Sequence, residues 1–398
     1  MVVPLVALYG LSKVSYGRCN CRARKKKRFR RWWSKPHIRN NYMTGYGAYQ
    51  LVYHKFKMND EEDFIRYTTM NIHTFNYIFE IMRPSLTKGS KRPPLPPELR
   101  FSLTIRYLAH NDCTDTLAIM YNIGYSTVLK VIKEVCLKIC EVLGPVFLKF
   151  PTKAEFQSIA MDFHVNLDMP NCIGAIDGRH CPIKKPPNSG SLFFNYKKFF
   201  SINLMTICDS EKRFIWANIG DYGNMNDAGV LMHSDLGIAL NENVVQLPPI
   251  TYLPGSNLRS SHYFVGDGIF PLKTYLMKPF NRNINLTVPQ RIFNYRLSHS
   301  RRIVECAFGQ LSQQWQVNQN TLNWSLLTSE KIIMSTLILH NILIDIELNE
   351  VNNRWSKCPI VGHNNRRNDG INEFAVRNQL CEYFVSPAGD VPYQWENI

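Results

Sequence analysis

This 398-residue sequence lacks long apolar runs, paired cysteine motifs and, at its beginning, acidic residues. The first two absences each exclude a class of protein. No stretch approaches the 18 uninterrupted apolar residues that a membrane-spanning helix needs, so we predict no membrane span. The 11 cysteines are scattered without a pair of CxxC motifs, which argues against both a zinc framework and a disulfide framework. Acidic residues are absent from residues 1–40. A hydrophobic fraction of 45% and an aromatic fraction of 12% indicate a globular chain with buried cores.

Positive charge is concentrated at the N-terminus. Residues 1–40 hold 12 of the 47 lysines and arginines, and the rest of the chain is nearly balanced, with 35 basic against 31 acidic residues. The run RARKKKRFRRWW, at residues 22–33, is typical of nuclear import or of docking onto phosphates; the alternative is a solvated arm without a specific partner. We therefore predict a basic disordered tail over residues 1–45 and a location in the nucleus, with the cytoplasm as a second compartment.

Beyond the tail, the pattern predicts three further parts. Residues 58–150 are almost wholly helical, with one amphipathic helix expected to end at Pro84. Residues 165–348 alternate strand and helix patterns, which predicts an α/β domain, and residues 349–398 are expected to be a polar C-terminal extension.

A helix-turn-helix pattern lies inside the helical part. We expect a helix over Thr114–Tyr121, a tight turn through Asn122–Gly124, and a helix from Ser126, its expected N-cap, to about Leu143. Lys130 and Lys133 fall outside the apolar stripe of the second helix and are candidate DNA-binding residues. An ordinary helical hairpin explains the pattern equally well. The residues of the stripe are Val128, Ile132, Val135 and Ile139.

In the α/β part, acidic residues are expected at the ends of buried elements. Asp177 and Asp267 each end a predicted strand, and Glu305 lies on a later helix. The predicted elements are strands over Cys172–Ile176, Ser201–Cys208, Arg213–Ile219 and His262–Gly266, and helices over Asp227–Leu240 (with Asp227 as N-cap), Arg301–Gln316 and Glu330–Leu348.

Three acids on separate elements predict a metal site. Ligands collect beyond the carboxyl ends of strands in α/β sheets, and grouped carboxylates are costly unless a cation neutralises them. Mg²⁺ prefers oxygen ligands and retains waters that can take part in chemistry, and a pair of such ions can promote phosphoryl displacement. Taken singly, each Asp-Gly is more often a turn. An aspartic protease is rejected because Asp177 and Asp267 precede glycine directly, without the Asp-Thr-Gly or Asp-Ser-Gly loop.

Five segments in one order carry a family resemblance. Together with the closing VPYQW they resemble the PIF/Harbinger transposases and the nucleases domesticated from them, over about Phe64–Gln394. The segments are CIGAIDGRHCPIKKP, FFNYKKFFSINLMTICD, GNMNDAGVL, YFVGDGIFPLKTYLMKPF and SRRIVECAFGQLSQQW.

The resemblance implies an RNase H-like catalytic core, preceded by the helix-turn-helix-like domain. It also implies a DDE triad at Asp177, Asp267 and Glu305 that uses Mg²⁺ or Mn²⁺, with Asp227 as a further metal ligand or, alternatively, only a helix cap. Ser312 departs from the family, which often has a basic stretch there. The resemblance implies DNA as the substrate and a Myb-like DNA-binding protein as a partner. We also expect a homo-oligomer.

Basic residues flank the expected triad and are candidates for contacts with DNA phosphates; a solvated charged face is the alternative. The sequence therefore favours a divalent-metal-dependent DNA nuclease using a two-metal DDE mechanism. The alternative is a domesticated, non-catalytic DNA-binding or adaptor protein that keeps the transposase fold. The flanking basic residues are Lys184, Lys185, Lys197, Lys198, Arg291, Arg296, Arg301 and Arg302.

Overall fold

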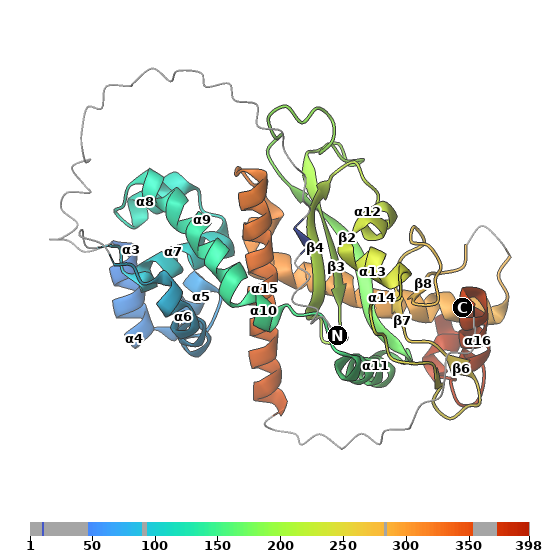
Figure 1. Cartoon of the computed structure of the whole chain (residues 1–398). Coiled ribbons are helices and arrows are strands. Elements are labelled where there is room, and N and C mark those ends of the chain that lie inside the picture. The colour runs from blue at the N-terminus through green and yellow to red at the C-terminus, as the bar shows by residue number, and fades with distance from the viewer. Residues whose placement is uncertain (1–9, 12–46, 90–93, 282–284, 353–371, 398) are drawn as a thin grey trace, which may run out of the picture.

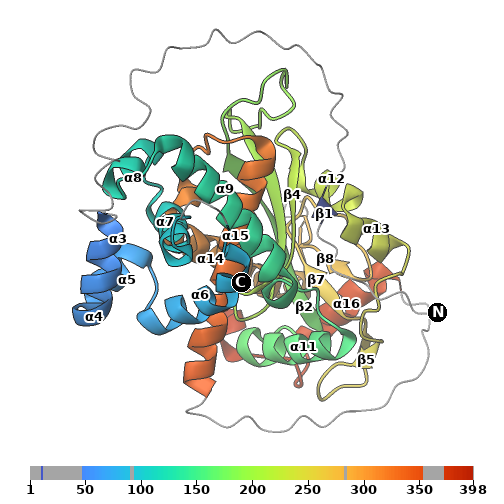
Figure 2. The same cartoon turned by 60° about the vertical axis from the view of Figure 1, so that its left-hand side comes forward.

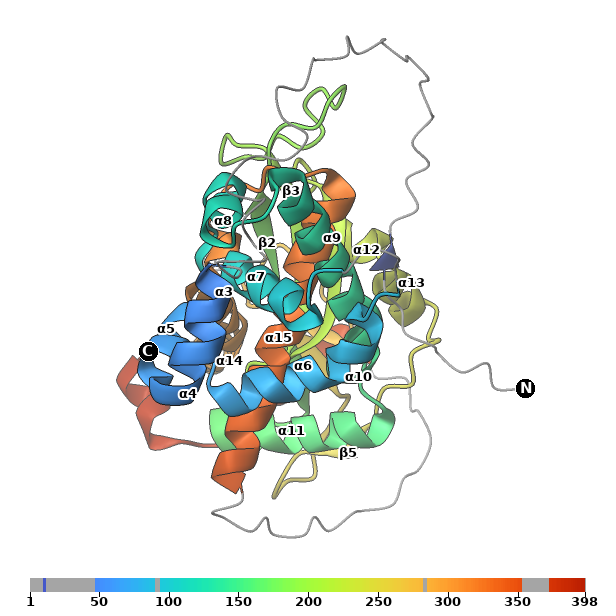
Figure 3. The ribbon, with the colours of Figure 1, turned by 90° about the vertical axis from the view of Figure 1, so that its left-hand side faces the viewer.

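A long helix, α15 (Leu326–Asn352), stands between a group of helices and a mixed β-sheet (Figures 1 and 3). The computed structural model describes residues 10–11, 47–89, 94–281, 285–352 and 372–397. The predicted tail over residues 1–45 lies almost wholly outside these residues. Among the described helices, none combines the length and the apolar character needed to cross a membrane.

The helical prediction for residues 58–150 is confirmed. Here α6 continues two residues beyond the expected stop at Pro84, because a proline in the last helical turn costs few backbone hydrogen bonds. The elements are α3 (Ala48–Gln50), η1 (Leu51–Phe56), α4 (Lys57–Asn59), α5 (Glu61–Thr68), α6 (Ile72–Leu86), α7 (Pro97–His110), α8 (Thr114–Met120), α9 (Tyr125–Val142), α10 (Gly144–Phe147) and α11 (Lys153–Leu167).

The two helices of the helix-turn-helix pattern are present as α8 and α9, joined by a short turn. The predicted apolar stripe of α9 is buried, and Lys130 and Lys133 are exposed. The expected cap at Ser126 is wrong: Gly124 occupies the N-cap and no side chain caps the helix, because α9 begins one residue earlier than predicted.

Helix α15 is apolar around most of its circumference because it packs on both sides. It contacts α9 on one side and β4 on the other, and the Ser335 hydroxyl donates to the Cys136 carbonyl of α9 at 3.0 Å. A helix that is hydrophobic all round belongs in a core. This helix therefore joins the helical region to the sheet (Figure 2).

The sheet has the strand order β1-β4-β3-β2-β7-β8. Strand β3 is antiparallel to both neighbours, whereas β7 and β8 run parallel to β2. The predicted α/β class, an RNase H-like mixed sheet flanked by helices, is confirmed. The strands are β1 (Gly10–Leu11), β2 (Cys172–Pro182), β3 (Ser201–Cys208), β4 (Phe214–Tyr222), β7 (Tyr263–Val265) and β8 (Leu276–Met277), with a separate hairpin of β5 (Thr251–Tyr252) and β6 (Arg259–Ser260).

Three predicted boundaries in this domain are wrong. Strand β2 does not end at Asp177 but continues to Pro182, because its polar half pairs with β3. The single helix expected over Asp227–Leu240 is two helices, α12 (Asp227–His233) and α13 (Asp235–Asn241), since Ser234 caps the second. Helix α14 (Val288–Gln314) begins 13 residues before the predicted start.

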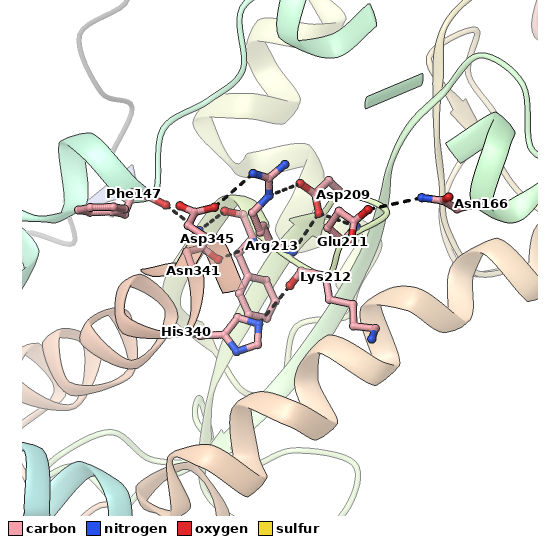
Figure 4. A network of polar contacts seen from close by, with 10 residues as sticks. Phe147, Asn166, Asp209, Glu211, Lys212, Arg213, His340, Asn341 and Asp345 are labelled. Carbon is pink, nitrogen blue, oxygen red and sulfur yellow. Dashed lines mark hydrogen bonds and ion pairs between the residues drawn. The ribbon is translucent and has the colours of Figure 1, made fainter. Parts of the chain in front are cut away.

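A polar network fixes the β3–β4 turn against α15 and α10 (Figure 4). The Asn341 side chain accepts a hydrogen bond from the Phe214 backbone N–H at 2.9 Å and donates to the carbonyls of Phe214 and Phe147 at 2.8 and 2.7 Å. Arg213 donates to the buried carboxylate of Asp209 at 2.7 Å and pairs with Asp345 at 3.2 Å. The network satisfies buried backbone groups from three elements at one place.

The segment predicted as a polar extension contains two packed elements. They are α16 (Glu373–Phe384) and η3 (Pro392–Asn397), and both contact α14. Arg296 of α14 is almost fully buried and donates to Gln394 at 2.7 Å and to the Asp168 carbonyl at 2.8 Å. The end of the chain is therefore held against the helix that carries Glu305.

Candidate active site

Asp177 and Asp267 come level with each other along the neighbouring strands β2 and β7. Strand β2 pairs in parallel with β7 as far as Ala175 and Val265, and each aspartate lies two residues beyond its paired residue. Asp177 is in the middle of β2, opposite Thr206 of β3, whereas Asp267 follows the end of β7. The parallel pairing thus brings together two acids that are 90 residues apart in the sequence.

Asp227 joins them from α12. The expectation that it caps this helix is wrong: the cap is Asn226, whose side chain accepts from the Gly229 N–H at 2.8 Å, and Asp227 is the first helical residue. The Asp227 carboxylate instead accepts a hydrogen bond from the Asn203 amide at 3.0 Å.

Gly178 allows this approach because it has no side chain. A Cβ atom at residue 178 would lie 2.2 Å from an Asp227 carboxylate oxygen, closer than any real contact allows. The residue next to Asp177 therefore has to be glycine for Asp227 to reach its position.

Arg301 links Glu305 to the aspartates. Its guanidinium lies 3.7 Å from an Asp177 carboxylate oxygen and 2.5 Å from a Glu305 carboxylate oxygen. Arg301 and Glu305 are one turn apart on α14, the spacing at which side chains on one helix face meet. The Glu305 side chain is 48% exposed, so it can move without breaking the core.

The electrostatics of the cluster are visible in Asp177. Burial raises the pKa of its carboxyl from 3.8 to about 6, against the opposing effects of the Arg301 charge and of the Gly178 backbone hydrogen bond. The neighbouring charges of Asp227 and Asp267 raise it further. The charges of Asp227 and Asp267 therefore act on Asp177, and the charge of Arg301 opposes them.

Arg179 docks the helix that carries Glu305. Its guanidinium donates to the Phe308 carbonyl at 3.1 Å and to the Asn318 carbonyl at 3.2 Å, and it also contacts the Ser312 hydroxyl. Ser312 lies where the resembling family often has a basic stretch. In this chain the Ser312 hydroxyl accepts a hydrogen bond from the Arg179 guanidinium. Strand β2 thus supplies both an acid of the site and the arginine that positions α14 beside it.

The four acids fit a divalent cation in the chemistry of their donors. Mg²⁺ and Mn²⁺ favour carboxylate oxygens, and Asp177, Asp227, Asp267 and Glu305 supply them from a strand, a loop and two helices. Within the described residues, no three acidic, histidine or cysteine side chains are already close enough to enclose an ion. Arg301 occupies the space between Asp177 and Glu305 instead.

Most of the predicted phosphate-binding residues are exposed, with two exceptions: Arg296 is buried, and Arg301 is part-buried and paired with Asp177 and Glu305. Lys184, Lys185, Lys197, Lys198 and Arg302 are exposed, and in the described part of the chain none of them forms an ion pair. Arg296 is not available to DNA because it is buried against the C-terminal segment. Lys130 and Lys133 lie on α9, in the helical region rather than at the acids.

A cleft of about 460 Å³ opens beside the acids, between β2, the loop before β3 and α14. It is lined by Asp227, Glu305, His180 and the exposed Tyr196 and Lys197, among others. The His180 imidazole contacts the Ser201 hydroxyl at 3.1 Å, and burial lowers its pKa. The cleft gives a solvent-accessible approach to the cluster.

Sequence reasoning assigned no role to Asn203, Arg179 or Gly178. The polar residue Asn203 interrupts the apolar run of β3, and this was a usable signal that one face of the strand meets a site. The contact between Gly178 and Asp227 depends on how α12 packs, and no sequence pattern reveals it.

Comparison with known proteins places these acids in a family. Residues 176–341, which include all four, match the family model described as DDE superfamily endonuclease. "Protein ALP1-like" of Arabidopsis thaliana is 27% identical over 290 residues, covering 69% of this chain and 68% of its own length. "Putative nuclease HARBI1" of Homo sapiens is 22% identical over 312 residues, covering 75% of this chain and 83% of its own length. No solved structure gives a significant match.

Proposed function

We propose, from the match of residues 176–341 to the DDE superfamily endonuclease model and from the similarity to the ALP1-like and HARBI1 proteins, that the chain is a Harbinger-related, divalent-metal-dependent DNA endonuclease. The observation that carries the proposal is that Asp227 and Asp267 lie near enough to Asp177 for their charges to raise its pKa, with Glu305 connected to Asp177 through Arg301. Like-charged carboxylates beside a buried carboxyl are costly unless a cation binds them, so such a group is a candidate functional site.

DDE superfamily endonucleases generally use divalent metals, and the four acids would hold Mg²⁺ or Mn²⁺ here. When bound, the ions supply the Lewis acidity that activates a water or a 3′-hydroxyl and stabilises the leaving oxygen of a phosphodiester. The protein's contribution is positioning. β2 and β7 fix Asp177 and Asp267, Asn203 orients Asp227, and Glu305 approaches from α14.

Arg301 has a second task in this mechanism. Its guanidinium offsets the charge of Asp177 and Glu305. With those carboxylates neutralised by a cation, the guanidinium would be available to an anionic substrate. Because it is planar and always charged, a guanidinium suits a phosphate.

The proposed DNA contacts lie on two surfaces. Lys184, Lys185, Lys197 and Lys198 are exposed in the segment between β2 and β3, and Lys197 also lines the cleft beside Asp227 and Glu305. Lys130 and Lys133 would contact duplex DNA from α9 if the helix-turn-helix reads a groove. A Myb-like DNA-binding partner, a homo-oligomer and a nuclear or cytoplasmic location remain part of the proposal.

A cleavage assay tests the function directly. We expect the full-length protein to cut terminal-repeat duplex DNA in Mn²⁺, and the Asp177→Asn variant to lose this activity while keeping its fold. Glu382→Gln, which neutralises an exposed carboxylate on α16, is the matched control and should cut like wild type. Cleavage that survives Asp177→Asn would refute the assignment of the site.

The alternative is a non-catalytic DNA-binding or adaptor protein, and one observation favours it. Glu305 is paired with Arg301 rather than grouped with the aspartates, and the described residues hold no preformed metal group. Calorimetry separates the two functions. The endonuclease binds Mn²⁺ and loses this binding in Asp177→Asn, whereas the adaptor binds DNA equally well in both forms and takes up no metal.

A further inference from the structure

A second cleft adjoins the candidate active site on the side of the C-terminal helix. It has a volume of about 690 Å³ and lies among Asp267, the segment after β8, α14 and α16. Asp267 and Arg301 line this cleft and also belong to the acidic cluster, so the cleft borders the candidate active site. Its outer wall includes Arg377 of α16, a residue beyond the region 176–341 that matches the endonuclease family.

The cleft is lined by cations. Lys278, Arg301 and Arg377 border it, and the acid among its lining residues is Asp267. Lys278 donates to the Gly268 carbonyl at 3.1 Å, which holds its ammonium near Asp267. Three positive groups at one cleft favour an anionic ligand.

Arg377 is the cation least explained by the fold. Its guanidinium lies over the Phe280 ring, 3.8 Å from the ring centroid. Its buried Nε has no hydrogen-bond partner, and in the described part of the chain no carboxylate pairs with it. A partly buried guanidinium without an acid is costly unless a ligand supplies the missing negative charge. Stacking on Phe280 fixes the plane of the guanidinium.

The position of Arg377 relative to the acids is rigid. Helix α16 is held on α14 by the near-parallel rings of Phe384 and Phe293, whose centroids are 6.3 Å apart. Buried Arg296 also lies over the Phe384 ring and donates to Gln394. The same helix, α14, carries Arg301 and Glu305. Arg377 therefore has a fixed position relative to the acids.

We propose that this cleft binds a backbone phosphate of the DNA strand that enters the acidic cluster, with Arg377 as the positioning residue that holds it. The inference rests on the proposed endonuclease function, which supplies the DNA strand at Asp267. A guanidinium can bind a phosphodiester through two parallel N–H groups. The volume lies within the range of about 300–1,000 Å³ typical of ligand pockets. Phe280 and Leu297 provide the apolar walls against which a sugar or base can lie.

The test is a salt titration of DNA binding in the full-length protein, with Asp177→Asn in every sample so that no strand is cut. We expect Arg377→Gln to weaken binding of a labelled terminal-repeat duplex about tenfold and to lower the salt slope by about 1, which is the signature of one lost phosphate contact. Arg377→Lys should restore the slope but only part of the affinity, because an ammonium lacks the two parallel donors.

Arg83→Gln is the matched control, because Arg83 also lies over a phenylalanine, 5.1 Å from the Phe79 ring centroid, but is exposed on α6. This variant should leave both affinity and slope unchanged. If Arg377→Gln does not fold, Lys278→Gln replaces it with the same expectation. An unchanged salt slope in the folded variant overturns the proposal.

The test distinguishes failure of the phosphate-binding cleft from failure of the proposed endonuclease function. Wild-type protein that cuts DNA, together with an unchanged slope in Arg377→Gln, refutes the cleft alone. Wild-type protein that does not cut, together with a reduced slope, refutes the endonuclease and supports the cleft as a DNA-binding surface.

Discussion

Neutralising Asp177 should stabilise the metal-free protein, although the residue lies at the centre of the candidate active site. Burial raises the pKa of this carboxyl to about 6, and the charges of Asp227 and Asp267 act in the same direction, with Arg301 opposing them. In the unfolded chain the carboxyl titrates near its ordinary value of 3.8. The folded protein therefore binds a proton more tightly at this residue than the unfolded chain does.

The sign and size of the effect follow from linkage. Below pH 4 the carboxyl is protonated in both states and costs nothing. Between pH 4 and pH 6 the unfolded chain loses its proton first, so the free energy of unfolding falls as pH rises. Above pH 6 the full penalty of about 3 kcal/mol is reached, from 1.36 kcal/mol per pKa unit. This penalty already includes the opposing effect of the Arg301 charge, so we expect the neutral Asp177→Asn variant to gain up to about 3 kcal/mol at pH 8.

Urea unfolding of the metal-free, full-length protein measures this gain. The difference between Asp177→Asn and wild type should grow between about pH 4 and pH 6 and then stay nearly constant. Glu382→Gln, which neutralises an exposed carboxylate, should show no such growth. Saturating Mn²⁺ should reverse the order, since only wild type gains binding energy from the ion. A variant that is less stable than wild type at pH 8 without metal would refute the reasoning.

Three further predictions concern the surroundings of the site. Gly178→Ala should reduce cleavage and Mn²⁺ affinity at least tenfold in a protein that still folds. The reason is that a Cβ atom at residue 178 would lie 2.2 Å from an Asp227 carboxylate oxygen and would displace that carboxylate. Mn²⁺ binding that is unaltered in calorimetry would contradict this. Asn341→Leu should cost about 2–4 kcal/mol in urea unfolding, because it leaves the Phe214 N–H and its partner carbonyls unsatisfied, and a cost below 1 kcal/mol would contradict this. Lys130→Glu and Lys133→Glu should each weaken duplex binding several-fold if α9 contacts DNA, and equal affinity of wild type and both variants would leave α8 and α9 as an ordinary helical hairpin.

The sequence predicted best those elements in which the residues that set the hydrophobic period are also the residues buried in the structure. The stripe Val128, Ile132, Val135 and Ile139 predicted α9 because the same residues that set the period are buried against α15 and α7. Strand β3 was predicted over its full length because all eight of its residues are buried. In both cases local propensity and tertiary packing favour the same structure.

The wrong boundaries occur where a strand or helix continues through polar residues. Strand β2 was predicted to end at Asp177 because its apolar run stops there, yet its ladder with β3 continues to Pro182. The beginning of α14 was also missed, although Thr287 and Gln290 form a capping box and Pro289 lies at the second helical position. That signature was readable from the sequence.

The acids of the site were identified from the sequence, but their relationships were not. Asp177, Asp267 and Glu305 follow from motifs, whereas the register of β2 on β7 and the packing of α12 decide how Asp227 meets Gly178. The pairing of Arg301 with Glu305 is a partial exception, because a spacing of four on a helix already predicts it. Contacts between elements distant in sequence needed the structure.

Arg301 borders the cleft of Arg377 and contacts two acids of the proposed metal site, so it would link metal binding to DNA binding. Its guanidinium contacts Asp177 and Glu305 on one side and borders the cleft of Arg377 on the other. A cation that neutralises the acids releases this guanidinium for a phosphate, and a phosphate that attracts it leaves the acids in greater need of a cation. Because linkage between two binding equilibria is reciprocal, each ligand must favour the other by the same factor. The proposed site would thus favour binding its ion and its DNA strand together over binding either alone.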